Sequence, residues 1–207
     1  FRFYFPEHTL YMLNYAGNTQ ADNFAFWNAI GTFELFYPPA YAKILEENSD
    51  AFNDANAKPL IATLLPRVYA NQFQAGNKSI TMLYNARKFT VDEPALKVLS
   101  DPGYHYFDLL HCREIPAHNS ALSLRLHPGD VAAVARLPKV LSVQKHEVAL
   151  SQIPNNAAIA ICDVNGAELW RQSVKNTRVV LPATLPAGAV AVKLFTGKYL
   201  LDAAPIE

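Results

Sequence analysis

The sequence has little charge and little glycine. Only 17% of its 207 residues are Asp, Glu, Lys or Arg, and 18 basic side chains balance 18 acidic ones. A polybasic arm for nucleic acid and extensive disorder are therefore not expected. With 8 glycines and no G-x-x-x-x-G-K-[ST], G-x-G-x-x-G or G-x-S-x-G motif, we predict neither a phosphate-binding loop nor a nucleophile elbow.

Cysteines and long apolar runs are also scarce. Cys112 and Cys162 can form a disulfide only if the fold brings their Cα atoms within about 7 Å, and two ordinary buried thiols are the favoured interpretation. Because no run of 18 apolar residues occurs, we expect no membrane span. The chain opens in the apolar segment FRFYF without an initiator methionine, so we expect a processed protein or a piece of a longer one.

The spacing of apolar residues changes near residue 67. Before it, Phe24, Trp27 and Ile30 recur every three residues, which predicts a short helix with an apolar stripe and with Asp22 or Asn23 as its N-cap. A second helix is expected after residues 38–39. Beyond residue 68 the apolar residues fall in short runs bounded by Pro, Gly and Asn, which is typical of an antiparallel sandwich.

These patterns predict an α+β, mainly β fold: a short βα, largely helical N-terminal segment followed by antiparallel β-sandwich segments. Residues 1–67 are expected to form terminal βα elements of a barrel-like domain, and residues 68–152 an antiparallel β-sandwich. Residues 153–207 are expected to form a small Ig-like β module or to complete that sandwich, with Asn165-Gly166 as a hairpin turn.

One segment gathers several side chains of the kind that bind metals. His105, Asp108, His111 and Cys112 all fall in YHYFDLLHCRE. On a strand the two histidines share a face but lie about 20 Å apart, whereas zinc ligands converge within about 2.3 Å of the ion. Ordinary histidines on a strand at the edge of the core are the better interpretation, and we expect neither a metal nor a cofactor.

Sugar cleavage needs two carboxylates about 5–10 Å apart. Glu7 follows the strand-like FRFYF segment, and residues just after a strand lie at the rim of a barrel where its chemistry takes place. Glu7, next to His8, can equally be a surface or capping acid, because no partner is identifiable. Glu34 lies between two aromatic residues but follows no predicted strand. The catalytic residues therefore stay unknown.

Aromatic residues make up 12% of the chain and gather near its start. Flat rings pack against the apolar faces of sugars, so this density suits a carbohydrate site. Phe26, Tyr37 and Tyr41 are the rings that we expect to line a rim, whereas Trp27 belongs to the apolar stripe of the first helix. Aromatic residues at helical spacing are also common in cores, and that alternative stays open.

Five segments in order resemble the last barrel units and the following β-sandwich of glycoside-hydrolase-like proteins of the α-galactosidase and α-amylase-like kind. They are FRFYFPEH, NFAFWNAIGTFELFYP, PLIATLLPRVYANQF, KSITMLYNARKFTVDE and YHYFDLLHCRE. The resemblance covers residues 1–150. It implies a (β/α)8 barrel whose earlier strands, with the catalytic carboxylates, lie outside this sequence. Glu7 and His8 then stand where a late-strand substrate contact is expected.

The last segment, AICDVNGAELWRQSVKNTRVVLPATLPAGAVAVKLFTGKYLL, resembles small Ig-like modules at the ends of secreted bacterial proteins. A D-x-x-G hairpin followed by an L-P-A-G turn carries this resemblance. It implies that the module attaches or packs against other parts of the protein. It also implies an extracytoplasmic location, either periplasmic or secreted.

Three functional hypotheses follow. The first is the C-terminal portion of a carbohydrate-active, glycoside-hydrolase-like protein that has no turnover alone and supports a barrel supplied by the remainder of a longer chain or by a partner subunit. The second is a noncatalytic carbohydrate-binding or adhesion protein with Phe26, Tyr37 and Tyr41 as an exposed platform. The third is a structural subunit of an assembly, with an uncovered apolar face. No nucleic-acid partner is expected, because basic and acidic residues are interspersed.

Overall fold

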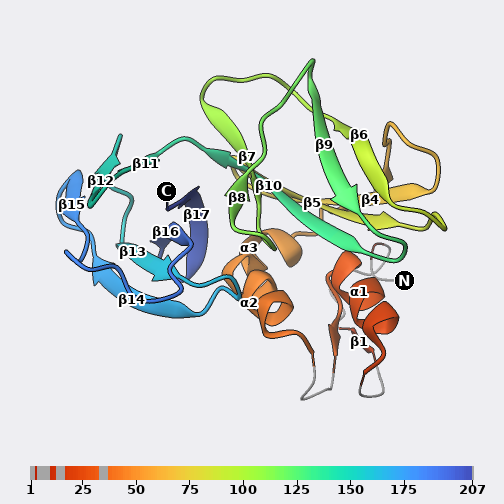
Figure 1. The fold of residues 1–207 in the computed structure, drawn as a ribbon, viewed down its shortest axis with the longest axis horizontal. Coiled ribbons are helices and arrows are strands. Elements are labelled where there is room, and N and C mark those ends of the chain that lie inside the picture. Colours follow the sequence, from red (N-terminus) through yellow and green to blue (C-terminus); the bar gives the residue numbers. More distant parts are fainter. Residues whose placement is uncertain (1–2, 4–9, 13–16, 33–36, 207) are drawn as a thin grey trace.

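The computed structural model describes residue 3 and residues 10–12, 17–32 and 37–206. Within these ranges the chain is mainly β with a few short helices, which confirms the predicted fold class. The helices come first in the chain and the antiparallel sheets follow (Figure 1). No helix in the described ranges has the length and apolar character needed to cross a membrane.

The first described elements form a βαβ unit. Strand β1 (Tyr11–Met12) pairs in parallel with β2 (Gly31–Thr32), and helix α1 (Thr19–Trp27) connects them. The N-cap of α1 is Asn18, whose side chain accepts a hydrogen bond from the Ala21 amide at 3.1 Å. The expected caps, Asp22 and Asn23, lie inside the helix instead, because Asn18 satisfies one of the free amides of the first turn.

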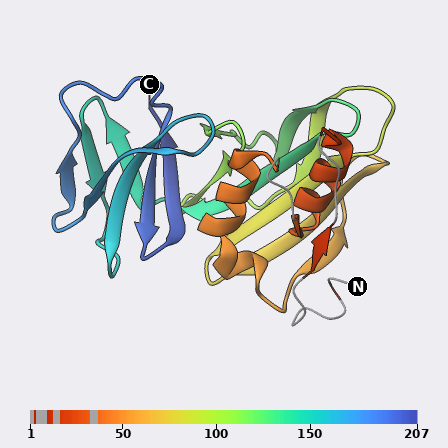
Figure 2. The ribbon, with the colours of Figure 1, turned by 90° about the horizontal axis from the view of Figure 1, so that it is seen from below.

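Two further helices follow, and only Asn48 separates them. Helix α2 (Pro39–Glu47) starts with a proline, whose missing amide costs nothing at that position. Helix α3 (Ser49–Phe52) is one turn long and packs on the sheet through Phe52. Together, α1, α2 and α3 lie across one face of the central sheet (Figure 2).

The central sheet has six strands in the order β3-β4-β5-β10-β7-β8, and all neighbours are antiparallel. A separate two-stranded antiparallel sheet covers its other face. The central strands are β3 (Lys58–Ile61), β4 (Val68–Ala75), β5 (Lys78–Asn85), β7 (Tyr104–Asp108), β8 (Arg113–Glu114) and β10 (Val131–Pro138). The covering pair is β6 (Val91–Lys97) and β9 (Ala121–Leu126).

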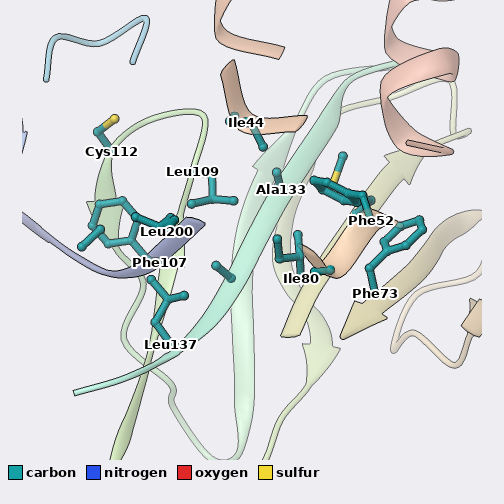
Figure 3. Close-up of a cluster of buried hydrophobic side chains, with 14 of the residues drawn as sticks. Ile44, Phe52, Phe73, Ile80, Phe107, Leu109, Cys112, Ala133, Leu137 and Leu200 are labelled. Atoms are coloured by element: carbon teal, nitrogen blue, oxygen red, sulfur yellow. The ribbon is translucent and has the colours of Figure 1, made fainter. Parts of the chain in front are cut away.

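Alternating side chains fill both faces of this sheet. Ile80 and Ala133 point to the helices, where they join one buried cluster with Phe52 (Figure 3). Leu83 and Val134 point the other way, into a second cluster beneath the β6-β9 pair. The sheet is therefore a layer between two cores, which explains why β5 and β10 are apolar on both faces.

The last part of the chain is a smaller sandwich with a core of its own. One sheet has the order β11-β12-β15 and the other β14-β13-β16-β17. Because β12 pairs with β15, residues 141–150 share a sheet with strands beyond residue 153. The strands are β11 (Leu141–Gln144), β12 (Glu147–Leu150), β13 (Ala157–Cys162), β14 (Glu168–Ser173), β15 (Arg178–Val180), β16 (Ala191–Thr196) and β17 (Tyr199–Pro205).

Two local predictions for this region agree with the structure. The turn at Asn165-Gly166 joins β13 to β14, and Gly166 has a positive φ of 76°. Cys112 and Cys162 are both free and buried. Burial raises the pKa of the Cys162 thiol to about 12.

Candidate functional site

The five expected substrate contacts fall in different surroundings. Glu7 and His8 lie outside the described residues, so their expected role stays a prediction. Phe26 is completely buried, and its ring stacks on Tyr41 with centroids 4.0 Å apart. The structure thus places Phe26 in the core and corrects its expected position on a rim. Tyr37 is partly buried and meets Tyr41 edge-on at 5.7 Å.

Tyr41 is fixed by its stacking on Phe26 and by a hydrogen bond of its hydroxyl. Its hydroxyl donates to Asn23 Oδ1 at 2.6 Å, and Asn23 Nδ2 donates to the Gly129 carbonyl at 3.0 Å. These bonds connect α1, through Asn23, and α2, through Tyr41, to the turn between β9 and β10. Burial, followed by the negative charges of Asp130 and Asp22, raises the pKa of Tyr41 to about 12. The hydroxyl therefore stays protonated and remains a hydrogen-bond donor.

A pocket of about 470 Å³ opens beside Tyr41, between the helical segment and the sandwich. We call it the Tyr41 pocket. Its volume falls in the range of small-molecule sites. Its polar lining comes from segments far apart in the sequence: Asn23, Tyr41, His111, Arg113, Arg125, His127 and Asp130.

Buried Asp108 organises one wall of the Tyr41 pocket. Its Oδ1 accepts hydrogen bonds from the Leu110 and His111 amides at 3.1 and 3.2 Å. Its Oδ2 lies 2.8 Å from His111 Nδ1 and 3.5 Å from Arg113 Nε. The hydrogen bond to Asp108 raises the pKa of His111, although partial burial opposes this effect. Asp108 thus holds two basic side chains in place and favours the charged imidazolium.

The opposite wall is the turn that was expected between two strands at residues 127–130. The His127 amide donates to Asp130 Oδ2 at 2.9 Å, and His127 Nδ1 lies 3.0 Å from Thr90 Oγ1. Gly129 adopts a positive φ of 80°, which a residue with a side chain rarely takes. The turn presents His127 and Asp130 to the pocket.

A larger pocket of about 930 Å³ lies between the central sheet and the last sandwich. His105 lines it, with Nε2 2.6 Å from Asp202 Oδ1 and Nδ1 3.7 Å from Glu114 Oε1. Asp202 Oδ2 also accepts from the Val140 and Leu141 amides at 2.8 and 2.7 Å. Both imidazole nitrogens face carboxylates, so we interpret His105 and Asp202 as a structural joint. The Tyr41 pocket is the better candidate site.

An aromatic group on the surface was missed by the sequence patterns. The Trp27 ring lies 5.7 Å from Phe24, 6.3 Å from Tyr69 and 5.5 Å from Tyr84. Phe24 is 45% exposed and Tyr69 42% exposed. The expected apolar stripe therefore holds for buried Trp27 but is wrong for Phe24. The period of three could not show that Phe24 lies on the outer side of α1.

The four suspected metal ligands do not converge. His105 contacts Asp202, His111 contacts Asp108, and Cys112 Sγ lies 4.0 Å from the Asp163 carbonyl. In the described part of the chain, no group of three or more His, Cys, Asp or Glu side chains has a geometry suited to a metal ion.

Comparisons with known proteins give weak likenesses to glycoside hydrolases and related enzymes. An α-amylase from Anoxybacillus has a TM-score of 0.32 and 11% identity, over 41% of this chain and 19% of the amylase. A GH30 endoxylanase from Clostridium papyrosolvens has a TM-score of 0.39 and 14% identity, over 61% of this chain and 41% of the xylanase. A γ-CGTase from alkalophilic Bacillus clarkii has a TM-score of 0.31 and 12% identity, over 81% of this chain and 28% of the CGTase.

These likenesses do not identify a family, because every TM-score lies below 0.5. The chain spans less than half the length of each of these three structures. No protein-family model matches the sequence, and no curated protein is significantly similar to it.

Proposed function

We propose that this chain is the C-terminal portion of a carbohydrate-active, glycoside-hydrolase-like protein, in which it supports a barrel whose catalytic carboxylates lie outside the chain. The remainder of a longer chain or a partner subunit supplies that barrel. The proposal includes an extracytoplasmic location, which the resemblance of the last segment to modules of secreted proteins supports.

The parallel pairing of β1 with β2 carries this proposal. Each strand is only two residues long, and within the described ranges the two pair only with each other. Parallel strands are normally covered on both faces and belong to larger sheets, because their crossover helices lie on the faces. A βαβ unit this small therefore fits the end of a larger parallel sheet.

Contacts between this unit and the central sheet support the buttressing role. Helix α1 packs on β5 and β10, and Asn71 Nδ2 donates to the Trp27 carbonyl at 3.2 Å. Asn23 makes a second polar contact, with the turn at Gly129. Both bonds join α1 to the central sandwich. Strands added beside β1 and β2 would therefore be anchored to that sandwich through α1.

Mass spectrometry of the intact protein from its natural source tests this proposal. We expect a mass well above that of these 207 residues, or a tightly bound second chain that supplies the barrel. A lone native chain with the mass of these residues alone contradicts the proposal. Efficient glycoside cleavage by the purified 207-residue chain would place the catalytic pair inside it and also contradict the proposal.

A noncatalytic carbohydrate-binding or adhesion protein is the second candidate. The Tyr41 pocket favours it, because a tyrosine ring there stands beside hydrogen-bonding groups from both sandwich walls. The burial of Phe26 removes one ring of the expected platform. Oligosaccharide binding by a native protein of only these residues would favour this candidate over the barrel-supporting role.

A further inference from the structure

The Tyr41 pocket is unusually rich in groups that donate hydrogen bonds. His111, Arg113, Arg125 and His127 all line it, whereas Asp130 supplies its one carboxylate. An arginine side chain has only donors, and a protonated histidine likewise. A sugar hydroxyl both donates and accepts, so it does not need such an excess of donors. An acceptor-only group, such as a carboxylate, matches this lining better.

Asp108 contacts two donor side chains of one wall, His111 and Arg113, before any ligand binds. Asp108 contacts Nδ1 of His111 and Nε of Arg113 from behind the wall. Nε2 of His111 and the terminal nitrogens of Arg113 have no partner within the described residues. A histidine held by such a hydrogen bond loses little conformational entropy on binding, which favours affinity.

The charges around the pocket show when it attracts an anion. Arg113 and Arg125 are positive, Asp130 is negative, and buried Asp108 offsets one further positive charge from behind. Asp92 lies 4.0 Å from Arg125, but both side chains are largely exposed and water screens this pair. The pocket is therefore close to neutral when both histidines are neutral, and it becomes positive once His111 is protonated.

We propose that the Tyr41 pocket binds a sugar residue that carries a carboxylate, namely a uronic acid. The carboxylate lies between His111 and Arg113, a ring hydroxyl donates to Asp130, and the sugar ring rests beside Tyr41. This inference deepens the proposed function and rests on its carbohydrate-active assignment. It names the class of saccharide that this part of the protein recognises.

The proposal predicts a characteristic pH dependence. His111 is faced by Asp108, Arg113 and Asp130, and His127 and Arg125 line the same pocket. Binding is strongest where the sugar carboxyl is ionised and His111 is still protonated. Affinity then falls as the pH rises through the pKa of His111, because the donated proton and the positive charge are lost together.

Calorimetry on the recombinant full-length protein and its variants tests the proposal, with trigalacturonate and a neutral galactotriose as probes. We expect trigalacturonate to bind at least tenfold more tightly at about pH 6. Arg113→Gln should weaken its binding roughly 10- to 100-fold, because a charge-assisted hydrogen bond is lost. Arg178→Gln is the matched control, because Arg178 lies 78% exposed on β15 of the other sandwich.

His111→Gln provides the second readout. It should remove most of the change in trigalacturonate affinity between about pH 6 and 8, while Arg178→Gln leaves the change intact. If Arg113→Gln fails to fold, Arg125→Gln replaces it, because the Arg125 side chain is 67% exposed. Arg125→Gln should weaken binding in the same direction.

Three outcomes would overturn the inference. Galactotriose binding as tightly as trigalacturonate would refute the carboxylate class. Equal affinities of the Arg113→Gln and Arg178→Gln proteins would refute the location. Unchanged pH dependence in His111→Gln would refute the role of that proton. The native mass decides the barrel-supporting role separately, so the two proposals can fail independently.

Discussion

Lys193 Nζ lies 2.7 Å from Glu47 Oε2 in the interior, although 146 positions separate the two residues along the chain. Their side chains are only 2% and 3% exposed. The pair joins the end of α2 to β16, so it ties the helical segment directly to the last sandwich.

Removing one member of this pair should be costly. Lys193→Met leaves the Glu47 carboxylate buried without a cation, and we expect a loss of about 3–5 kcal/mol in the free energy of unfolding, measured by urea denaturation. The double variant Glu47→Leu with Lys193→Met should recover most of that loss. Lys175→Met is the control, because Lys175 is exposed to solvent. A single variant no less stable than this control would contradict the prediction.

Lys78 is a second buried cation with three partners. Its Nζ lies 2.8 Å from Asp50 Oδ1, 2.8 Å from the Leu200 carbonyl and 3.3 Å from Asn48 Oδ1. Lys78→Met should lower the free energy of unfolding by about 3 kcal/mol, because buried acceptors lose their donor. Lys58→Met, on the exposed edge strand β3, should change it by less than about 0.5 kcal/mol. Equal effects in the two variants would show that the Lys78 contacts contribute no net stability.

The contact between His111 and Asp108 should be visible in an NMR titration. We expect the pKa of His111 to lie above its ordinary value, because Asp108 stabilises the imidazolium. Asp108→Asn should lower this pKa while preserving the shape of the side chain. Since the folded pKa is raised, the contact stabilises the protein below the unfolded pKa and ceases to do so as pH rises through the folded pKa. A His111 pKa unchanged in Asp108→Asn would refute this coupling.

The joint at Asp202 should control local opening between the two sandwiches. Asp202 Oδ2 accepts from the amides of Val140 and Leu141, and an asparagine amide nitrogen in that place would face two donors. Asp202→Asn should therefore speed hydrogen exchange of these two amides severalfold or more. The amides of Ile159 and Ile161, within the core of the last sandwich, serve as the internal control. Equal acceleration at all four amides would indicate global destabilisation instead.

The two cysteines should resist alkylation in the native protein. Burial raises the pKa of both thiols, and it raises that of Cys162 to about 12. Because the thiolate is the reactive form, iodoacetamide should label neither residue appreciably at about pH 8 until the protein unfolds. Mass spectrometry before and after denaturation measures this. Rapid labelling of native Cys162 would contradict the buried position.

Much of the fold could be predicted from local patterns. Short apolar runs with turn residues between them indicated the antiparallel strands, and Asn165-Gly166 indicated one hairpin correctly. Strand pairing across residue 152 could not be predicted, because the β12-β15 contact depends on how distant segments pack. The exposure of Phe24 and burial of Phe26 also depend on packing, since α1 contacts both β5 and β10.

The candidate site was predictable only in fragments. Tyr41 was expected to contact a sugar, and Asp108 and His111 were noted together as possible metal ligands in one segment. Their arrangement beside one pocket depends on the segment after β7, which carries His111, coming close to Tyr41 on α2, and no local pattern shows this. Arg113 and Arg125 gave no signal, because scattered arginines on strands usually face solvent.

The buried links from Glu47 and Asp202 limit how this chain can be recombined. Both residues are matched to partners in another layer, so exchanging the last sandwich for an unrelated module would leave Glu47 without the Lys193 cation and His105 without the Asp202 carboxylate. A homologous replacement would have to carry the helical segment with it. The helices and the terminal sandwich are thus expected to be inherited as a single block rather than shuffled as independent pieces.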